Sequence, residues 1–141
     1  MDLSTNYLGF HLRNPLVAGA SPMSPEVDTV CAMEQAGIAA VVVYSLFEEQ
    51  IRHLTAADAY FDSLGAESFA ESTTYRPRLD YTPRGPEAYV AHVGDIRQAV
   101  DIPVIASLNG CTPGGWVDYA RMLQEVGAHA IELNIYDIPT D

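Results

Sequence analysis

Four short apolar runs alternate along the chain with segments of helical periodicity. The runs are Leu16–Ala18, Ala39–Tyr44, Pro103–Leu108 and Ala130–Ile135. Three of them are rich in Val or Ile and lack polar alternation, which is typical of strands buried on both faces. Strands that alternate with helices predict parallel strand–helix–strand units joined by right-handed crossovers.

The segments between these strands carry helix start and stop signals. Ser24-Pro25-Glu26 predicts an N-cap, a proline at the first helical position and an early acid, and Gly37 is a natural terminator of that helix. Ahead of the first strand, Asn6–Leu12 predicts a small hairpin that turns at Gly9. Three more helices are expected within Glu49–Leu64, from Pro86 to just before Pro103, and around Trp116 up to Gly127.

Two architectures accommodate four such units: an open doubly wound sheet or half of a barrel. The open sheet predicts a glycine-rich phosphate turn after the first strand, but that stretch reads Ala18–Met23 and contains no Gly-x-Gly-x-x-Gly. A full (β/α)₈ barrel takes about 250 residues. The sequence therefore predicts the N-terminal half of a (β/α)₈ TIM barrel, as one incomplete domain over residues 1–141 that stops before the barrel closes.

Composition narrows the classes of partner. Hydrophobic residues make up 48% of the chain, and seven Lys and Arg stand against 19 Asp and Glu, for a formal net charge of −12. This charge disfavours nucleic acids and anionic membrane surfaces. The start of the chain lacks the pattern of a signal peptide, and the longest apolar run, Ile38–Val43, is too short to span a bilayer. Cys31 and Cys111 show no metal or redox spacing. We expect a cytoplasmic protein with a small-molecule substrate.

In barrels the active site lies at the C-terminal ends of the strands. The residues expected there are small or carry amides and hydroxyls, which suit a flat heterocycle; they lie in Ala20-Ser21-Pro22, Tyr44-Ser45, Asn109–Thr112 and Asn134–Asp137. No His, Lys or paired carboxylate is among them, so a hydrolytic triad or a metal site has no support. Glu48-Glu49, just beyond the second strand, either orients a substrate amine or starts a helix. Glu132 should point inward if Asn134 does, and it then needs a partner inside the barrel.

Several motifs resemble one enzyme family. Asn14–Pro22 is similar to the opening of dihydroorotate dehydrogenases, and Glu132–Ile135 is similar to a Glu-Leu-Asn strand of the same family. Ser45–Ile51, and Ile105–Gly110 together with Gly114-Gly115-Trp116, resemble more closely a bacterial branch of dihydroorotate dehydrogenase-like proteins. The resemblance extends over essentially the whole chain.

The resemblance implies an FMN-dependent barrel that oxidises dihydroorotate to orotate in pyrimidine biosynthesis. Carried over by position, Ala20 and Ser21 would pass along the flavin ring, although ordinary turn chemistry also explains Ser21. Ser45 and Asn109 would lie on the flavin side. Asn134 would reach the flavin and, in the family, the substrate.

The chain also departs from the family at three places. Tyr44 occupies the position of the family's Lys at the end of the second strand, and Ser63–Tyr81 replaces its substrate loop. Asp137 stands where the cytosolic enzymes carry a Cys as catalytic base; it serves either as the base or as a loop acceptor. The family holds the FMN phosphate on loops after later strands. We therefore expect this chain alone to bind FMN weakly or not at all.

Two classes of function follow. The first is an FMN oxidoreductase of which these residues form the N-terminal part. The second is a non-catalytic half-barrel that associates with another copy or with a partner chain, which would cover its open strand edges. A nicotinamide-binding open sheet is disfavoured by the missing glycine fingerprint.

Overall fold

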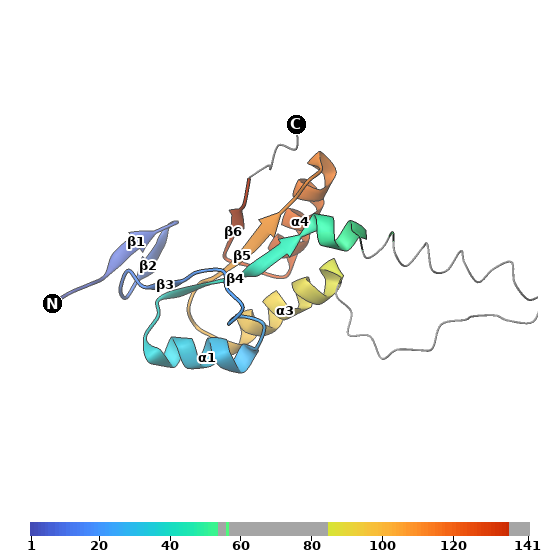
Figure 1. Cartoon of the computed structure of the whole chain (residues 1–141). Coiled ribbons are helices and arrows are strands. Elements are labelled where there is room, and N and C mark those ends of the chain that lie inside the picture. The colour runs from blue at the N-terminus through green and yellow to red at the C-terminus, as the bar shows by residue number, and fades with distance from the viewer. Residues whose placement is uncertain (54–55, 57–84, 136–141) are drawn as a thin grey trace, which may run out of the picture.

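The computed structural model describes residues 1–53, 56 and 85–135. Its centre is a parallel sheet of four strands that lie side by side in chain order (Figure 1). The strands are β3 (Val17–Ala18), β4 (Ala40–Phe47), β5 (Val104–Asn109) and β6 (Ala130–Leu133). All four predicted strands are confirmed, although β4 runs three residues further than expected and β6 ends two residues earlier.

Three helices connect and cover these strands: α1 (Val27–Ala36), α3 (Pro86–Ala99) and α4 (Pro113–Glu125). Residues 48–53 are also helical, directly after β4. A proline occupies the first turn of both α3 and α4, where its missing N–H costs nothing. Gly37 and Gly127 take positive φ angles of 109° and 89° after α1 and α4, which explains why glycine ends both helices.

The predicted start of the first helix is wrong. α1 begins at Val27, and its N-cap is Glu26 without a side-chain hydrogen bond. Ser24 is instead buried, and its hydroxyl accepts a hydrogen bond from the backbone N–H of Tyr44 at 2.8 Å. The Ser24 hydroxyl, which the sequence predicts as a helix cap, therefore links the loop after β3 to β4 by a hydrogen bond.

The main core fills the space between the helices and one face of the sheet. Its fully buried members come from α1, α3, α4, β4 and β5, and they include Val30, Ile96, Leu123, Val41 and Val104. α3 contacts both α1 and α4, so the helices form one layer on the same side of the sheet (Figure 1). Four parallel strands in chain order with helices on one face are the arrangement of half a (β/α)₈ barrel.

The predicted hairpin is present. β1 (Thr5–Tyr7) pairs antiparallel with β2 (Phe10–Leu12), and both turn residues, Leu8 and Gly9, have positive φ angles of 51° and 83°. Such a turn matches the twist of the two strands. Leu12 packs with Ala39 and Ala40 at the start of β4, so the hairpin covers the N-terminal end of the sheet.

A register shift in β4 decides which side chains leave the core. Val42 pairs with Ile105, but Ser45 pairs with Ser107, so β4 contains one extra residue between these pairs. The Tyr44 ring turns to the helix side, where it packs edge-on against Tyr89 with ring centroids 5.1 Å apart. Ser45 thereby shares the opposite face of the sheet, the inner face, with Ser107.

Within the part of the chain that the structure describes, no helix is both long enough and apolar enough to cross a bilayer.

Candidate functional site

Four polar side chains form a connected cluster on the inner face, near the C-terminal ends of β4, β5 and β6. We call Ser45, Ser107, Glu132 and Asn134 the inner polar cluster. The Ser45 and Ser107 hydroxyls lie 2.8 Å apart, and the Ser107 hydroxyl donates to Glu132 Oε1 at 2.8 Å. Asn134 Nδ2 donates to Ser45 at 3.1 Å and to Ser107 at 2.9 Å. The structure therefore brings together two predicted site residues, Ser45 and Asn134.

Ser107 is the centre of the cluster and is fully buried. Its position is fixed from the helix side by Tyr89, whose hydroxyl donates to the Ser107 carbonyl at 3.0 Å and accepts from the Ser107 N–H at 3.1 Å. Burial raises the pKa of Tyr89 well above its usual value, which keeps this hydroxyl protonated. A buried residue of α3 thus anchors the strand that carries the inner polar cluster.

Sequence reasoning missed Ser107 and identified Glu132 only as an inward group without a partner. Ser107 is that partner. The signal was available in the spacing, because Ser107 precedes Asn109 by two positions and Glu132 precedes Asn134 by two, so each pair shares a face of its strand.

Asn109 is the last residue of β5 and lies on the same face as Ser107, opposite Phe47 of β4. It is half-buried, and its side-chain amide makes no hydrogen bond to any other described residue. Asn109 is therefore placed near the inner polar cluster with a donor and an acceptor that a ligand can use.

The loop after Asn109 is held by Glu48, whose side chain is buried. Its carboxylate accepts hydrogen bonds from the N–H groups of Cys111 and Thr112 at 2.6 and 3.0 Å, and from the Thr112 hydroxyl at 2.5 Å. Burial acts to raise the pKa of Glu48, but these hydrogen bonds outweigh it and the pKa lies below its usual value. Of the two roles predicted for Glu48-Glu49, Glu48 begins a helix and also stabilises the start of α4.

Two glycines from the motifs that resemble the dihydroorotate dehydrogenase-like branch, Gly110 and Gly115, lie where a side chain would not fit. A Cβ on Gly115 would collide with the Glu48 carboxylate, and a Cβ on Gly110 would lie 2.7 Å from the Trp116 ring. Thr112 caps α4 by accepting from the Gly115 N–H at 3.0 Å. The Gly110 to Trp116 segment is thus a structural unit that fixes the loop at the end of β5.

Ala20 and Ser21 follow β3. Among the described residues, neither of them makes a hydrogen bond to the inner polar cluster. Ala20 is exposed. The Ser21 hydroxyl accepts from the Met23 N–H at 3.3 Å, and the Ser21 carbonyl accepts from the Ser24 hydroxyl at 3.1 Å. The turn chemistry considered for Ser21 is therefore present, and its contact with a flavin stays a prediction.

Asp137, the predicted base, lies outside the described residues, as does the segment Ser63–Tyr81. Asn14, from the first resemblance motif, has a structural role: its amide donates to the Gly37 carbonyl at 2.9 Å and its oxygen accepts from the Leu16 N–H at 2.9 Å. No group of three or more His, Cys, Asp or Glu among the described residues is arranged to hold a metal ion.

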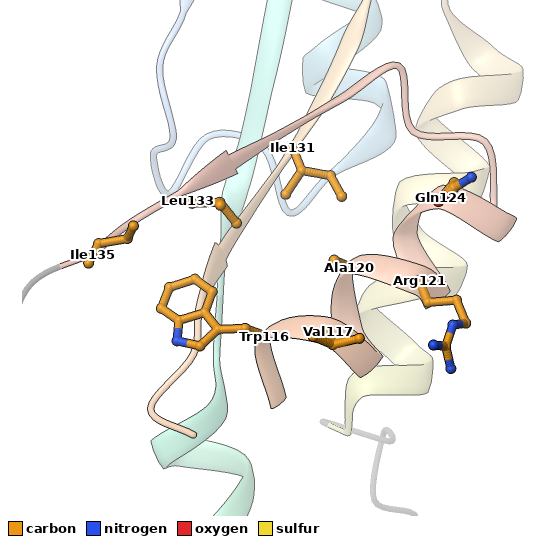
Figure 2. A pocket seen from close by; sticks show the side chains of 8 residues that line it. All are labelled: Trp116, Val117, Ala120, Arg121, Gln124, Ile131, Leu133 and Ile135. Carbon is orange, nitrogen blue, oxygen red and sulfur yellow. The ribbon is translucent and has the colours of Figure 1, made fainter. Parts of the chain in front are cut away.

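An apolar groove of about 570 Å³ lies on the other side of β6, between this strand and α4 (Figure 2). Trp116 and Val117 line it from α4, and Leu133 and Ile135 from β6 and the residues after it (Figure 2). Val117, Leu133 and Ile135 are 57%, 52% and 81% exposed, so apolar surface is open to solvent here. This groove and the inner polar cluster lie on opposite faces of the sheet.

The chain matches no known family profile. It is 36% identical over 88 residues to a protein of Aeropyrum pernix named "Putative dihydroorotate dehydrogenase A (fumarate)". The match takes in 47% of this chain and 28% of that protein. The chain therefore spans little more than a quarter of the relative that it matches, and the similarity is to part of a dihydroorotate dehydrogenase-like protein.

Proposed function

We propose that these residues form the N-terminal half of an FMN-dependent oxidoreductase of the dihydroorotate dehydrogenase type, which oxidises dihydroorotate or a related compound. The observation that carries the proposal is the inner polar cluster. It places two hydroxyls, an amide and the carboxylate of Glu132 at the C-terminal ends of three parallel strands, where barrel enzymes bind their ligands. The similarity to the Aeropyrum pernix protein points to the same chemistry.

The described residues fit the ring of a flavin better than its phosphate. The edge of a flavin ring carries carbonyl acceptors and an imide N–H. The half-buried amide of Asn109 offers both a donor and an acceptor, and Ser45 adds a hydroxyl oxygen. No Lys or Arg side chain is part of the inner polar cluster. We therefore assign the ring to these strand ends and expect the phosphate to need groups beyond them.

The proposed roles follow from the positions of the side chains. Asn134 and Ser45 bind and orient the ring and the substrate, and Tyr89 holds Ser107, to which both are bonded. Glu48 keeps the loop after Asn109 in place. Asp137 is the proposed base that removes a proton from the substrate carbon. A bound FMN would supply the acceptor for the hydride that leaves the substrate.

The test is anaerobic reduction. The protein from its native source would be loaded with FMN and mixed with dihydroorotate, and bleaching of the visible flavin absorption would be followed. We expect bleaching with the wild type and at least about tenfold weaker flavin or substrate binding for Asn134→Ala, since the substitution removes a ligand-facing amide and its two part-buried hydrogen bonds to Ser45 and Ser107. Asn6→Ala, in the hairpin, is the matched control. A flavin-loaded protein that dihydroorotate does not bleach would reject the substrate, and an unaffected Asn134→Ala would reject the site.

The apolar groove favours a second candidate function, a non-catalytic half-barrel that pairs with another copy. β3 and β6 are the outer strands of the described sheet, and exposed Leu133 ends β6, with exposed Ile135 two residues after it. Pairing of two copies would cover both. Because each copy has a net charge of −12, dimerisation should strengthen with salt. Light scattering that finds only a monomer at high salt would reject this candidate.

A further inference from the structure

The inner polar cluster has a fixed supply of protons. Four hydrogen bonds join its members. Each Ser hydroxyl contributes one proton and the Asn134 amide contributes two, while an ionised carboxylate contributes none. Carboxylates are ordinarily ionised at neutral pH. Four protons therefore serve four hydrogen bonds, and none is left to donate elsewhere.

The same count fixes the direction of each bond. The Ser107 proton goes to Glu132, so Ser107 accepts from Ser45. Both Nδ2 protons of Asn134 go to the two serines. The bonds thus run from Asn134 and Ser45 through Ser107 to the carboxylate.

What remains available to a ligand consists of acceptors. Ser45 uses its proton on Ser107 and one lone pair on Asn134, which leaves one lone pair. Asn134 offers Oδ1 and Glu132 offers Oε2, neither of which is hydrogen-bonded to another described residue. Ser45, Glu132 and Asn134 are all half-buried and so remain accessible, whereas Ser107 is fully buried.

We infer that the inner polar cluster recognises the N–H edge of a neutral ring and rejects carboxylates and phosphates, and that Glu132 is the positioning residue that sets this polarity. The inference rests on the proposed function and names the part of the ligand that faces these three strands. A lactam or ureide N–H satisfies an acceptor on the cluster, whereas an oxyanion placed against Ser45, Glu132 and Asn134 meets only lone pairs and the negative charge of Glu132. The amide of Asn109, which can donate, is not a member of the cluster.

Glu132 controls the polarity because it is the last acceptor of the chain of bonds. In Glu132→Gln, the new amide can donate to Ser107. The Ser107 proton can then turn to Ser45, and the Ser45 proton becomes available to a ligand. The substitution should therefore convert an acceptor surface into one that also donates, with little change in size.

The first experiment needs no ligand. Hydrogen exchange of the Asn134 side-chain amide would be measured by NMR in the wild type, in Glu132→Gln and in Glu125→Gln, an exposed position on α4 with the same change of charge. We expect both Asn134 protons to be protected in the wild type and in Glu125→Gln. Protection should also remain in Glu132→Gln, because both Asn134 hydrogen bonds persist when the Ser107 proton turns to Ser45. Exchange about fivefold faster in Glu132→Gln, as for the loss of one ordinary hydrogen bond, would contradict this rearrangement. Unprotected Asn134 protons in the wild type would overturn the proton count.

The second experiment uses two small probes, dihydrouracil, a neutral ring with N–H donors, and acetate. In the wild type we expect dihydrouracil to shift the resonances of Ser45 and Asn134 and acetate to leave them unchanged. Glu132→Gln should weaken dihydrouracil and admit acetate. If Glu132→Gln does not fold, Ser45→Ala provides the second test, since it frees one Asn134 N–H and should also admit acetate.

The outcomes separate this inference from the proposed function. Acetate that binds the wild type at Ser45 and Asn134, or dihydrouracil that does not, overturns the inference. Dihydrouracil binding without any flavin bleaching by dihydroorotate supports the inference and rejects the oxidoreductase.

Discussion

The face of the sheet that meets the helices and the inner face differ in what holds their side chains. On the helix side, Val41, Val104 and Leu108 pack against α1, α3 and α4 without a polar partner. On the inner face, Ser45 and Ser107 stand on the same strands and are held by directional hydrogen bonds. Packing tolerates small shifts of a side chain, but a hydrogen-bonded cluster needs defined positions. The comparison shows that one sheet carries an apolar core on one face and a hydrogen-bonded polar cluster, the proposed ligand site, on the other.

The largest effect on stability should come from removing a buried side chain on the helix side of the sheet. Ile96 of α3 is fully buried in the main core, so Ile96→Ala should lower the free energy of unfolding by about 2–5 kcal/mol through lost burial and the cavity that remains. Urea denaturation measures this. Val117→Ala, at a position 57% exposed, should change it by less than about 0.5 kcal/mol. If Ile96→Ala lowered the free energy of unfolding as little as Val117→Ala, the main core would not be what stabilises the protein.

The second prediction concerns the contribution to stability of Glu48, which directly follows β4. Glu48→Gln should cost about 1.5–3 kcal/mol, because three hydrogen bonds to a buried charge are weakened. Hydrogen bonds lower the pKa of the folded state below the ordinary 4.5, so the unfolded chain takes up the proton first. The contribution is therefore complete above about pH 4.5 and is lost as the pH falls through the folded pKa.

The measurement is urea denaturation at several pH values between neutral and acid. The loss of stability on acidification below about pH 4.5 should be smaller in Glu48→Gln than in the wild type. Exposed Glu49→Gln is the matched control and should keep the wild-type profile. An unchanged acid profile in Glu48→Gln would show that the carboxylate does not stabilise the start of α4.

Tyr89 reaches from the helix side to the strand that carries the inner polar cluster. Tyr89→Phe removes both hydrogen bonds to the Ser107 backbone and should cost about 1–3 kcal/mol. It should also shift the NMR resonances of Ser45 and Asn134, which no longer have a fixed neighbour. Tyr119→Phe, at a half-buried tyrosine of α4, is the control. A destabilised Tyr89→Phe with unshifted cluster resonances would separate stability from positioning.

The two faces also differ in how far sequence predicts them. The alternation of apolar runs and helical segments identified all four strands and their parallel order, because burial on both faces imposes that pattern. The extra residue in β4 was not predictable, since Val41-Val42-Val43 is apolar in either register. That single residue decides whether Ser45 or Tyr44 faces inward. The prediction that Ser24 caps the first helix was wrong for a related reason. The capping motif is local in sequence, but the Ser24 hydroxyl accepts a hydrogen bond from Tyr44 on another element.

The smallest expected effect is at the opposite, N-terminal end of the sheet. His129 Nδ1 accepts a hydrogen bond from the Val104 N–H at 3.0 Å, so the ring must be neutral at that nitrogen. Burial, with a smaller effect from Arg97, lowers its pKa below the ordinary 6.5. The unfolded chain therefore binds the proton first as the pH falls. Stability is complete above about pH 6.5 and declines below it, down to the folded pKa.

His129→Asn retains an acceptor near the position of Nδ1 but does not titrate. We expect its free energy of unfolding to stay within about 1 kcal/mol of the wild type at neutral pH, and to lose less than the wild type between pH 7 and pH 5. His53→Asn, at an exposed helical position, should keep the wild-type slope. If His129→Asn keeps that slope as well, His129 is not the group that couples the N-terminal end of the sheet to pH. The mild acid sensitivity must then come from the carboxylates, and the two ends of the sheet would share one cause of acid unfolding.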